Sequence, residues 1–213
     1  MTIVIAIDGP AAAGKGTLAR RVATELNLNY LDTGLLYRAT GFAVLQSNED
    51  PSDPASALKA AQNLQPADLD NDRLRDDECA QAASKVAAIQ SVRDQLLAFQ
   101  RSFAQTPPAG KKGSVLDGRD IGTVVCPDAD VKLFVTASVA VRAERRLKEL
   151  QNRGQDVIYA QVLKEMEERD ARDRDRDTAP LKPAEDAILL DTSELSIEDV
   201  IAKAVKIISE KTT

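Results

Sequence analysis

The sequence contains no histidine and no tryptophan, and it has only two cysteines among its 213 residues. Without histidine, a Ser-His-Asp type of catalytic triad is excluded. Cys79 and Cys126 lie far apart in the chain and belong to no C-x-x-C pair, so the sequence also argues against a zinc site. We expect both cysteines to be buried free thiols.

Long hydrophobic runs and an excess of positive charge are also missing. The apolar run Thr2–Ile7 is too short for a membrane span and has no basic residues before it, so it predicts a strand and not a signal peptide. The chain has 28 Lys and Arg against 34 Asp and Glu, a net charge of −6. We therefore expect a cytoplasmic protein that binds neither nucleic acid nor membranes.

Glycine is scarce, but three of the ten glycines fall in one stretch, Gly9-Pro10-Ala11-Ala12-Ala13-Gly14-Lys15-Gly16-Thr17. This stretch follows the strand-like run and precedes Leu18–Leu26, whose apolar residues have helical spacing. Strand, glycine-rich loop and helix are the context of a phosphate-binding loop, or P-loop, whose backbone N–H groups attract phosphate oxygens. Lys15 adds a full positive charge. The alternative is a glycine-rich turn with a surface lysine.

The stretch departs from the usual P-loop pattern, because Gly16 stands where a hydroxyl residue normally follows the lysine. Thr17 comes one residue later, so we expect it to reach Mg²⁺ only through water. The sequence Gly-Lys-Gly-Thr resembles the loop of small nucleoside and nucleotide kinases more than that of GTPases.

Strand-like and helical segments alternate along most of the chain. Strands are expected at Thr2–Ile7 and near residues 28–31, 114–116, 131–135 and 187–190, with helical patterns between them. This order predicts an α/β fold with a five-stranded parallel sheet of the P-loop NTPase type, flanked by helices. We assign residues 1–46 and 111–213 to this core.

Residues 47 to about 110 interrupt the alternation and predict an inserted helical lobe. The segment is rich in alanine and shows no strand-like pattern. Within it, Ala80–Phe103 has the spacing of one long helix, and Ser84, Lys85 and Arg93 are its polar candidates for contacting a substrate.

Charged residues follow two of the predicted strands. Asp117 stands where P-loop enzymes place a carboxylate toward Mg²⁺ or its waters, and Arg119 and Asp120 supply a donor and an acceptor beside it. A structural Asp-Gly turn is the alternative. Thr33 is expected to cap the helix that begins after the second strand, and Arg38 on that helix is either a phosphate clamp or a solvated arginine.

A charged run at Glu165–Asp177 has the composition of a solvated helix. Helical spacing nevertheless places Arg169, Arg172, Asp173 and Arg176 on one face. Three arginines on one face suit a polyanion such as ATP together with a second phosphate. Residues 154–178 are therefore the candidate for a short helical lid.

In their order and spacing, these motifs resemble the bacterial cytidylate kinases, nearly from one end of the chain to the other. The motifs are Gly14-Lys15-Gly16-Thr17, Leu31-Asp32-Thr33-Gly34, Tyr37-Arg38, the segment from Asp117 to Val125, Arg169-Asp170, Arg172-Asp173, Arg176 and Leu190-Asp191-Thr192-Ser193. Many relatives have serine where this chain has Thr33 and an aromatic residue where it has Cys126.

The resemblance implies transfer of the ATP γ-phosphoryl group to CMP or dCMP, giving CDP or dCDP plus ADP, with Mg²⁺. It implies that Gly9 to Thr17 hold the ATP phosphates and that the lobe binds the acceptor nucleotide. Beside the resemblance, the charge that phosphoryl transfer requires predicts Lys15, Arg119, Arg172 and Arg176 as the catalytic residues, and Thr17 and Asp117 are predicted to reach Mg²⁺ through water. The implied CMP-binding residues are Thr33, Arg38, Ser84, Arg93, Arg119, Asp120, Arg169, Asp173 and Arg176.

Within that set, the resemblance implies that Ser84, Arg93 and Asp120 contact the cytosine. Arg38 and Arg119 are implied to hold the acceptor phosphate, and Asp173 the sugar. We expect a monomer whose partners are small nucleotides. Two alternatives remain: a P-loop kinase for adenylate, uridylate or shikimate, and a nucleotide-dependent switch whose arginine-rich face binds an acidic partner, although the chain has no N-K-x-D guanine motif.

Overall fold

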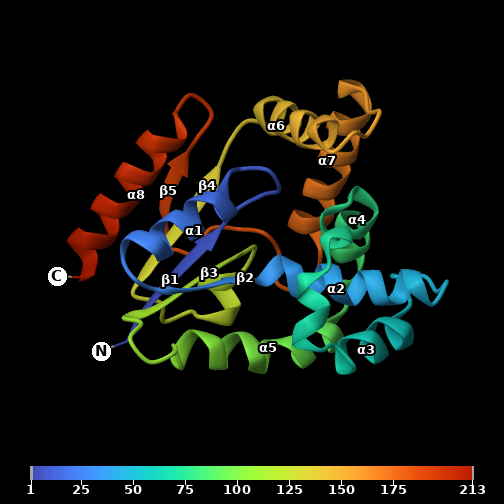
Figure 1. Cartoon of the computed structure of the whole chain (residues 1–213), viewed down its shortest axis with the longest axis horizontal. Coiled ribbons are helices and arrows are strands. Elements are labelled where there is room, and N and C mark those ends of the chain that lie inside the picture. The colour runs from blue at the N-terminus through green and yellow to red at the C-terminus, as the bar shows by residue number, and fades with distance from the viewer. Residues whose placement is uncertain (1, 213) are drawn as a thin grey trace.

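The centre of the molecule is a parallel β-sheet (Figure 1). The structure is a computed structural model that describes residues 2–212. The strands are β1 (Ile3–Asp8), β2 (Asn29–Asp32), β3 (Gly113–Gly118), β4 (Val131–Thr136) and β5 (Ile188–Asp191). They lie in the order β2-β3-β1-β4-β5, and every pairing is parallel. The predicted fold class is confirmed, and each predicted strand is present with its ends slightly shifted.

Helices cover both faces of the sheet because the side chains of a strand alternate between the two faces. Ile5 and Ile7 point toward α1 (Lys15–Glu25) and α8 (Ile197–Thr212), which lie together in Figure 1. Ala6 and Leu116 instead share a core with α5 (Gln90–Gln105) and the π-helical turn Ile121–Val125. No helix among residues 2–212 is long and apolar enough to cross a membrane.

Most of residues 47–110 form helices beyond one end of the sheet, on the right in Figure 1, whereas α5 returns along one face of the sheet. All these residues are described and none lies in a strand, so the predicted helical character is confirmed. With α2 (Thr33–Gln46) they enclose a separate apolar core. Their elements are α3 (Pro54–Gln62), the 3-10 turns Pro66–Asp70 and Asp72–Arg75, α4 (Asp77–Val86) and α5.

The prediction of one helix over Ala80–Phe103 is wrong. The helix breaks between Val86 and Gln90, because Ile89 adopts an extended conformation. The break lets α4 pack mainly against α2 while α5 packs against α3 and β3, and Val86 and Val92 on its two sides share one apolar core.

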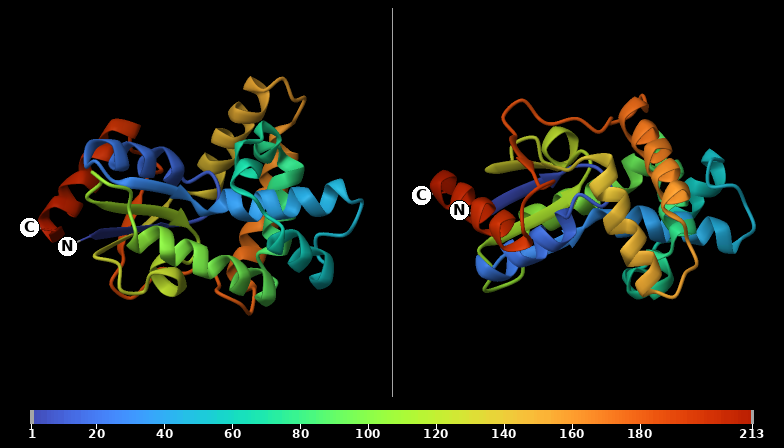
Figure 2. Two further views of the ribbon diagram at one scale, coloured as in Figure 1. Left: turned by 60° about the horizontal axis from the view of Figure 1, so that its bottom comes forward. Right: turned by 90° about the horizontal axis from the view of Figure 1, so that it is seen from above.

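Helices α6 (Val139–Asn152) and α7 (Tyr159–Asp175) pack against each other beside α4, and Figure 2 shows the pair from two sides. Ser138 accepts a hydrogen bond from the Val141 N–H, which makes it the cap predicted for α6. Helix α7 ends at Asp175, and Arg176 is extended. Arg176 is therefore the residue directly after the helix, and within the helix itself the predicted spacing applies only to Arg169, Arg172 and Asp173.

Candidate active site

The P-loop joins β1 to α1 as predicted. Gly14 caps α1 with φ 92°, a left-handed conformation that suits glycine. A Cβ atom on Gly9 would lie 1.9 Å from the Val135 carbonyl oxygen, so only glycine lets the loop pass this close to β4. Lys15 is 7% exposed, and its Nζ donates to the Pro10 carbonyl at 3.0 Å across the loop. Its ammonium group is thus held over the hollow of the loop.

Two carboxylates face Lys15 from the ends of neighbouring strands, because the sheet register places Asp32 directly opposite Asp117. Burial, together with the positive charge of Arg119, lowers the pKa of Lys15. Burial and the charge of Asp32 raise the pKa of Asp117, although Lys15 and Arg119 oppose that shift. The site therefore holds both positive and negative groups away from water. A bound anion would stabilise the charge of Lys15, and a bound cation would stabilise that of Asp117.

A cleft of about 350 Å³ opens beside the loop, and we call it the P-loop cleft. It contains Lys15, Thr17 and Asp117, as the sequence predicted. Five arginines also line it: Arg20, Arg38, Arg119, Arg146 and Arg169. Such a density of guanidinium groups suits a ligand that carries several negative charges.

A second and narrower space of about 50 Å³, which we call the inner cleft, lies between α2, α4, α7 and the end of β3. All nine residues predicted to bind the acceptor line it: Thr33, Arg38, Ser84, Arg93, Arg119, Asp120, Arg169, Asp173 and Arg176. The structure therefore brings together residues that span more than half of the sequence. Thr33 does not cap α2, because its hydroxyl instead donates to the Asp117 carbonyl at 2.7 Å.

The acidic residues of the inner cleft are held by arginine and serine. Asp120 accepts a hydrogen bond from Arg93, whose guanidinium stacks 5.6 Å from the centre of the Tyr37 ring. Asp173 accepts from the Arg119 Nε at 2.9 Å and from the Ser84 hydroxyl at 3.0 Å.

These partners affect the two carboxylates differently. Burial raises the pKa of Asp120, although the charges of Arg93 and Arg176 act in the opposite direction. Burial alone would also raise the pKa of Asp173, but Arg119 and Arg169 outweigh it and lower that pKa. Asp173 therefore remains ionised, whereas Asp120 holds a proton more readily than an exposed aspartate does.

Arg169 carries a donor that the protein does not satisfy. Its Nε–H is buried and has no hydrogen-bond partner among the described residues. Burial and the charge of Arg119 lower its pKa to about 9. A buried N–H group without an acceptor is costly, and an anionic oxygen would satisfy it.

The two other arginines predicted from the charged run, Arg172 and Arg176, have protein partners. Arg172 donates to Gln81 and to the Ser84 hydroxyl and lines neither cleft. Arg176 lines the inner cleft, donates to the Ala179 carbonyl at 2.8 and 2.6 Å, and lies 3.9 Å from Asp120. Both arginines are therefore held by protein groups outside α7.

Sequence reasoning missed two buried charges near the P-loop. Asp8 accepts hydrogen bonds from the backbone N–H groups of Ile121 and Gly122, each at 2.7 Å. Arg142 forms a bidentate pair with Asp170 and also donates to the carbonyls of Ala11 and Ala137. Asp8 could have been found from the sequence, because it is a charged residue at the end of the apolar β1 run. Arg142 could not, because it is one of many charged residues in its helix.

A largely apolar cleft of about 330 Å³ lies on the other side of the P-loop and was also not predicted. Its floor includes Gly14 and Thr17, and Thr192 closes one side by donating to the Ala13 carbonyl. Apolar residues of α8 and the preceding loop form the opposite wall: Leu195, Ile197, Val200 and Ile201.

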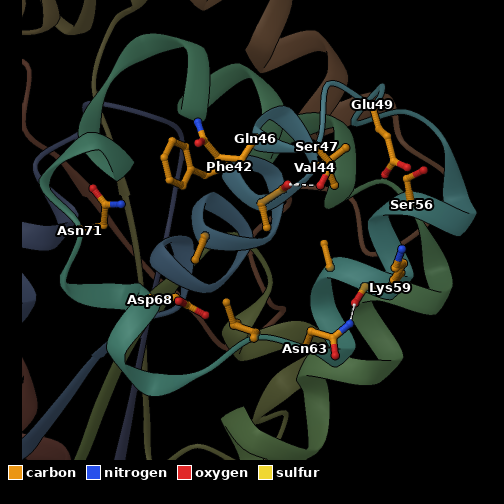
Figure 3. A pocket seen from close by; sticks show the side chains of 14 residues that line it. Phe42, Val44, Gln46, Ser47, Glu49, Ser56, Lys59, Asn63, Asp68 and Asn71 are labelled. Carbon is orange, nitrogen blue, oxygen red and sulfur yellow. Dashed lines mark hydrogen bonds between the residues drawn. The ribbon is translucent and has the colours of Figure 1, made fainter.

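A further cavity of about 340 Å³ lies between α2, α3 and the first 3-10 turn, shown in Figure 3. None of the predicted site residues lines it. Four of its polar side chains are engaged locally: Ser47 and Asn63 donate to helix carbonyls, and Asp68 and Asn71 accept from nearby backbone N–H groups. This cavity is therefore separate from the predicted site.

A family model described as cytidylate kinase matches residues 5–210 of this chain. The curated cytidylate kinase of Paramagnetospirillum magneticum is 63% identical, covering 99% of this chain and 100% of its own length. That of Rhodospirillum rubrum is 56% identical, covering 98% of each chain.

Among solved structures, a shikimate kinase from Bacteroides thetaiotaomicron has a TM-score of 0.50 at 12% identity, covering 98% of this chain and 97% of its own. An uncharacterized protein from Eubacterium ventriosum has a TM-score of 0.51 at 16% identity, covering 99% of this chain and 97% of its own. Similarities at such low identity show a shared fold alone. The family model and the curated relatives show more: the chain belongs to the cytidylate kinase family.

Proposed function

We propose that this protein transfers the γ-phosphoryl group of ATP to CMP or dCMP, giving ADP and CDP or dCDP. The observation that carries the proposal is that Arg38, Arg119 and Arg169 line both the P-loop cleft and the inner cleft. Phosphoryl transfer requires two phosphates in line and positive charge around the group that moves between them. Three arginines on the boundary of two adjoining clefts meet both requirements.

ATP is the donor in this proposal. Its phosphates lie along Gly9–Thr17, where the loop N–H groups, the α1 N-terminus and Lys15 attract them. The apolar cleft beside Gly14 and Thr17 is a suitable place for the adenine, because it adjoins the loop and offers an apolar wall with the Thr192 hydroxyl at its edge.

CMP occupies the inner cleft, with its base against Ser84, Arg93 and Asp120. An ionised Asp120 can accept a hydrogen bond from the cytosine 4-amino group, whereas uracil would place a carbonyl oxygen against it. Arg38 and Arg119 hold the acceptor phosphate because they face the P-loop cleft as well, and Asp173 binds the sugar.

The residues around Lys15 fit a bound Mg²⁺. Thr17 and Asp117 supply oxygen atoms in the P-loop cleft. Burial, and then the charge of Asp32, raise the pKa of Asp117, and a cation would offset both effects. Mg²⁺ is bound in many nucleotide sites by one or two carboxylates together with phosphates and water. When bound, it neutralises charge on the phosphate oxygens.

Lys15, Arg119, Arg172 and Arg176 are the proposed catalytic residues, and no protein nucleophile is required. Arg172 would have to exchange its contact with Gln81 for one with substrate. The inner cleft, at about 50 Å³, is far smaller than the 300–1,000 Å³ typical of ligand sites, so nucleotide binding requires movement. We propose that residues 154–178 move as a lid and residues 47–110 as the acceptor-binding lobe.

A cytoplasmic monomer is part of the proposal. A single chain supplies the residues that line both clefts. Cys79 and Cys126 are both free thiols, as is usual in a reducing compartment, although Cys126 is only half-buried and not fully buried as expected.

A coupled assay of ADP formation tests the proposal, with CMP, dCMP, UMP and AMP offered separately and one reaction without acceptor. We expect rapid ADP release with CMP or dCMP and little without an acceptor. ADP release that does not depend on an acceptor would instead support a nucleotide-dependent switch. Preference for UMP or AMP would support a different nucleotide kinase.

A further inference from the structure

Asp8 is a buried carboxylate to which the proposed reaction gives no role. It is the last residue of β1, where the sheet register places it opposite Gly118 on β3 and Phe134 on β4, and it is 4% exposed. Burial raises its pKa to about 6, even though two backbone N–H bonds act in the opposite direction. A charged group kept in such a place at that cost calls for an explanation.

Both hydrogen bonds of Asp8 connect it to the same turn. Its Oδ1 accepts from the Ile121 N–H and its Oδ2 from the Gly122 N–H, each at 2.7 Å. These are the first two N–H groups of the π-helical turn Ile121–Val125. Asp8 therefore caps this turn from a neighbouring strand, in the way that an N-cap side chain satisfies the free N–H groups of its own helix.

The anchored turn begins directly after Asp120, which is itself its N-cap residue with φ −146° and ψ 25°. The segment on the other side of Asp120 is tightly packed, since a Cβ on Gly118 would lie 2.7 Å from the Thr33 hydroxyl oxygen. Asp120 is thus held between a close-packed strand end and a turn that Asp8 fixes to β1. Its carboxylate has little freedom to turn away from the inner cleft.

We propose that Asp8 is the positioning residue for Asp120 and that, through it, Asp8 sets the choice between cytosine and uracil. This inference rests on the proposed function, in which Asp120 accepts from the cytosine 4-amino group. A purely structural Asp8 would affect every acceptor to the same extent. A positioning Asp8 affects CMP more than UMP, because only cytosine offers a donor to Asp120.

The test uses Asp8→Asn. Its side-chain oxygen still accepts from one backbone N–H, but its NH₂ group is a donor and cannot accept from the other. The control is Asp130→Asn, because Asp130 also accepts a backbone N–H bond, from Val4 at 2.7 Å, at the opposite end of β1. For both variants and the wild type, kcat/KM would be measured with CMP and with UMP, together with the KM for ATP.

We expect Asp8→Asn to narrow the CMP to UMP ratio of kcat/KM by roughly 10-fold, the cost of one hydrogen bond to a charged group. Asp130→Asn should leave the ratio unchanged. Combining Asp8→Asn with Asp120→Asn should narrow the ratio no further than Asp120→Asn alone, because both act on one contact. If Asp8→Asn does not fold, Asp8→Ser, whose hydroxyl can accept one N–H bond, takes its place in the same assay.

The outcomes separate this inference from the function on which it rests. If Asp120→Asn narrows the ratio and the Asp8 variants lower kcat/KM equally for both acceptors, Asp8 is structural only and the inference fails. If Asp120→Asn itself leaves the ratio unchanged, the proposed contact between Asp120 and the base is wrong, and the role of Asp8 falls with it.

Discussion

Arg174 and Arg176 lie two residues apart and differ sharply in their surroundings. The Arg174 side chain is 65% exposed and pairs with Asp175 at the surface. The Arg176 side chain is 4% exposed, lies 3.9 Å from Asp120 and donates to the Ala179 carbonyl. Arg174→Ala and Arg176→Ala remove the same groups, so the first is a matched control for the second.

The expected effect of Arg176→Ala follows from its proposed catalytic role, in which its guanidinium donates to a phosphate oxygen. Such a hydrogen bond contributes about 1.5 to 3 kcal/mol, and its loss would lower kcat/KM for CMP roughly 10 to 150-fold. Arg174→Ala should change kcat/KM by less than about 3-fold, because exposed ion pairs contribute little. Thermal unfolding of both variants and of Arg176→Lys shows whether a substitution lowers the stability of the fold. A loss of kcat/KM without a loss of stability is then a loss of catalysis and not of packing.

Amide exchange across residues 154–178 completes this test, with and without CMP and an unreactive ATP analogue. Arg172 and Asp173 already contact α4 through Gln81 and Ser84, so the candidate lid is linked to the lobe by these two contacts. We expect protection to increase when both nucleotides bind, because Arg169 then gains the partner its Nε–H lacks. Equal kinetic effects at 174 and 176, or exchange that nucleotides do not change, would refute this reasoning.

Three further predictions follow from buried charges. Lys15→Ala should lower kcat by at least about 100-fold without loss of the fold, measured by steady-state kinetics and circular dichroism. Because the pKa of Asp8 is raised from 3.8 to about 6, the folded state holds this proton more tightly than the unfolded state. The resulting stability is present below pH 3.8 and lost as pH rises through 6, so the wild type should lose about 3 kcal/mol more than Asp8→Asn over that range in urea unfolding. Arg142→Lys cannot form the bidentate pair with Asp170 and should lower kcat/KM roughly 10-fold, whereas an unchanged value would show that this link between α6 and α7 does not serve catalysis.

The features that the sequence predicted well are those encoded locally. Each strand of the sheet is a short apolar run between turn residues, so its position could be found without knowledge of its neighbours. The P-loop was recognisable because its glycines, Lys15 and the flanking strand and helix follow one another directly. The gathering of Ser84, Arg119 and Asp173 in one cleft followed only from the resemblance to a family, since no local pattern relates residues so far apart.

The features that the sequence did not predict depend on tertiary contacts. The break between α4 and α5 at Ile89 lets α4 pack mainly against α2 and α5 against α3 and β3. Helical spacing placed Arg176 on α7, but its guanidinium bonds to the Ala179 carbonyl beyond the helix end. The role of Asp8 as a cap for the turn after Asp120 depends on strands that are distant in the sequence and adjacent in the sheet.

The most direct test of the central claim is the CMP to UMP ratio of kcat/KM in the wild type and in Asp120→Asn, with the exposed Asp128→Asn as a control on the same connection. If Asp120 accepts from the cytosine 4-amino group, the wild type prefers CMP, Asp120→Asn narrows that preference by roughly 10 to 150-fold, and Asp128→Asn leaves it unchanged. A wild-type enzyme without a preference for CMP, or an equal ratio in Asp120→Asn and the wild type, would contradict the account.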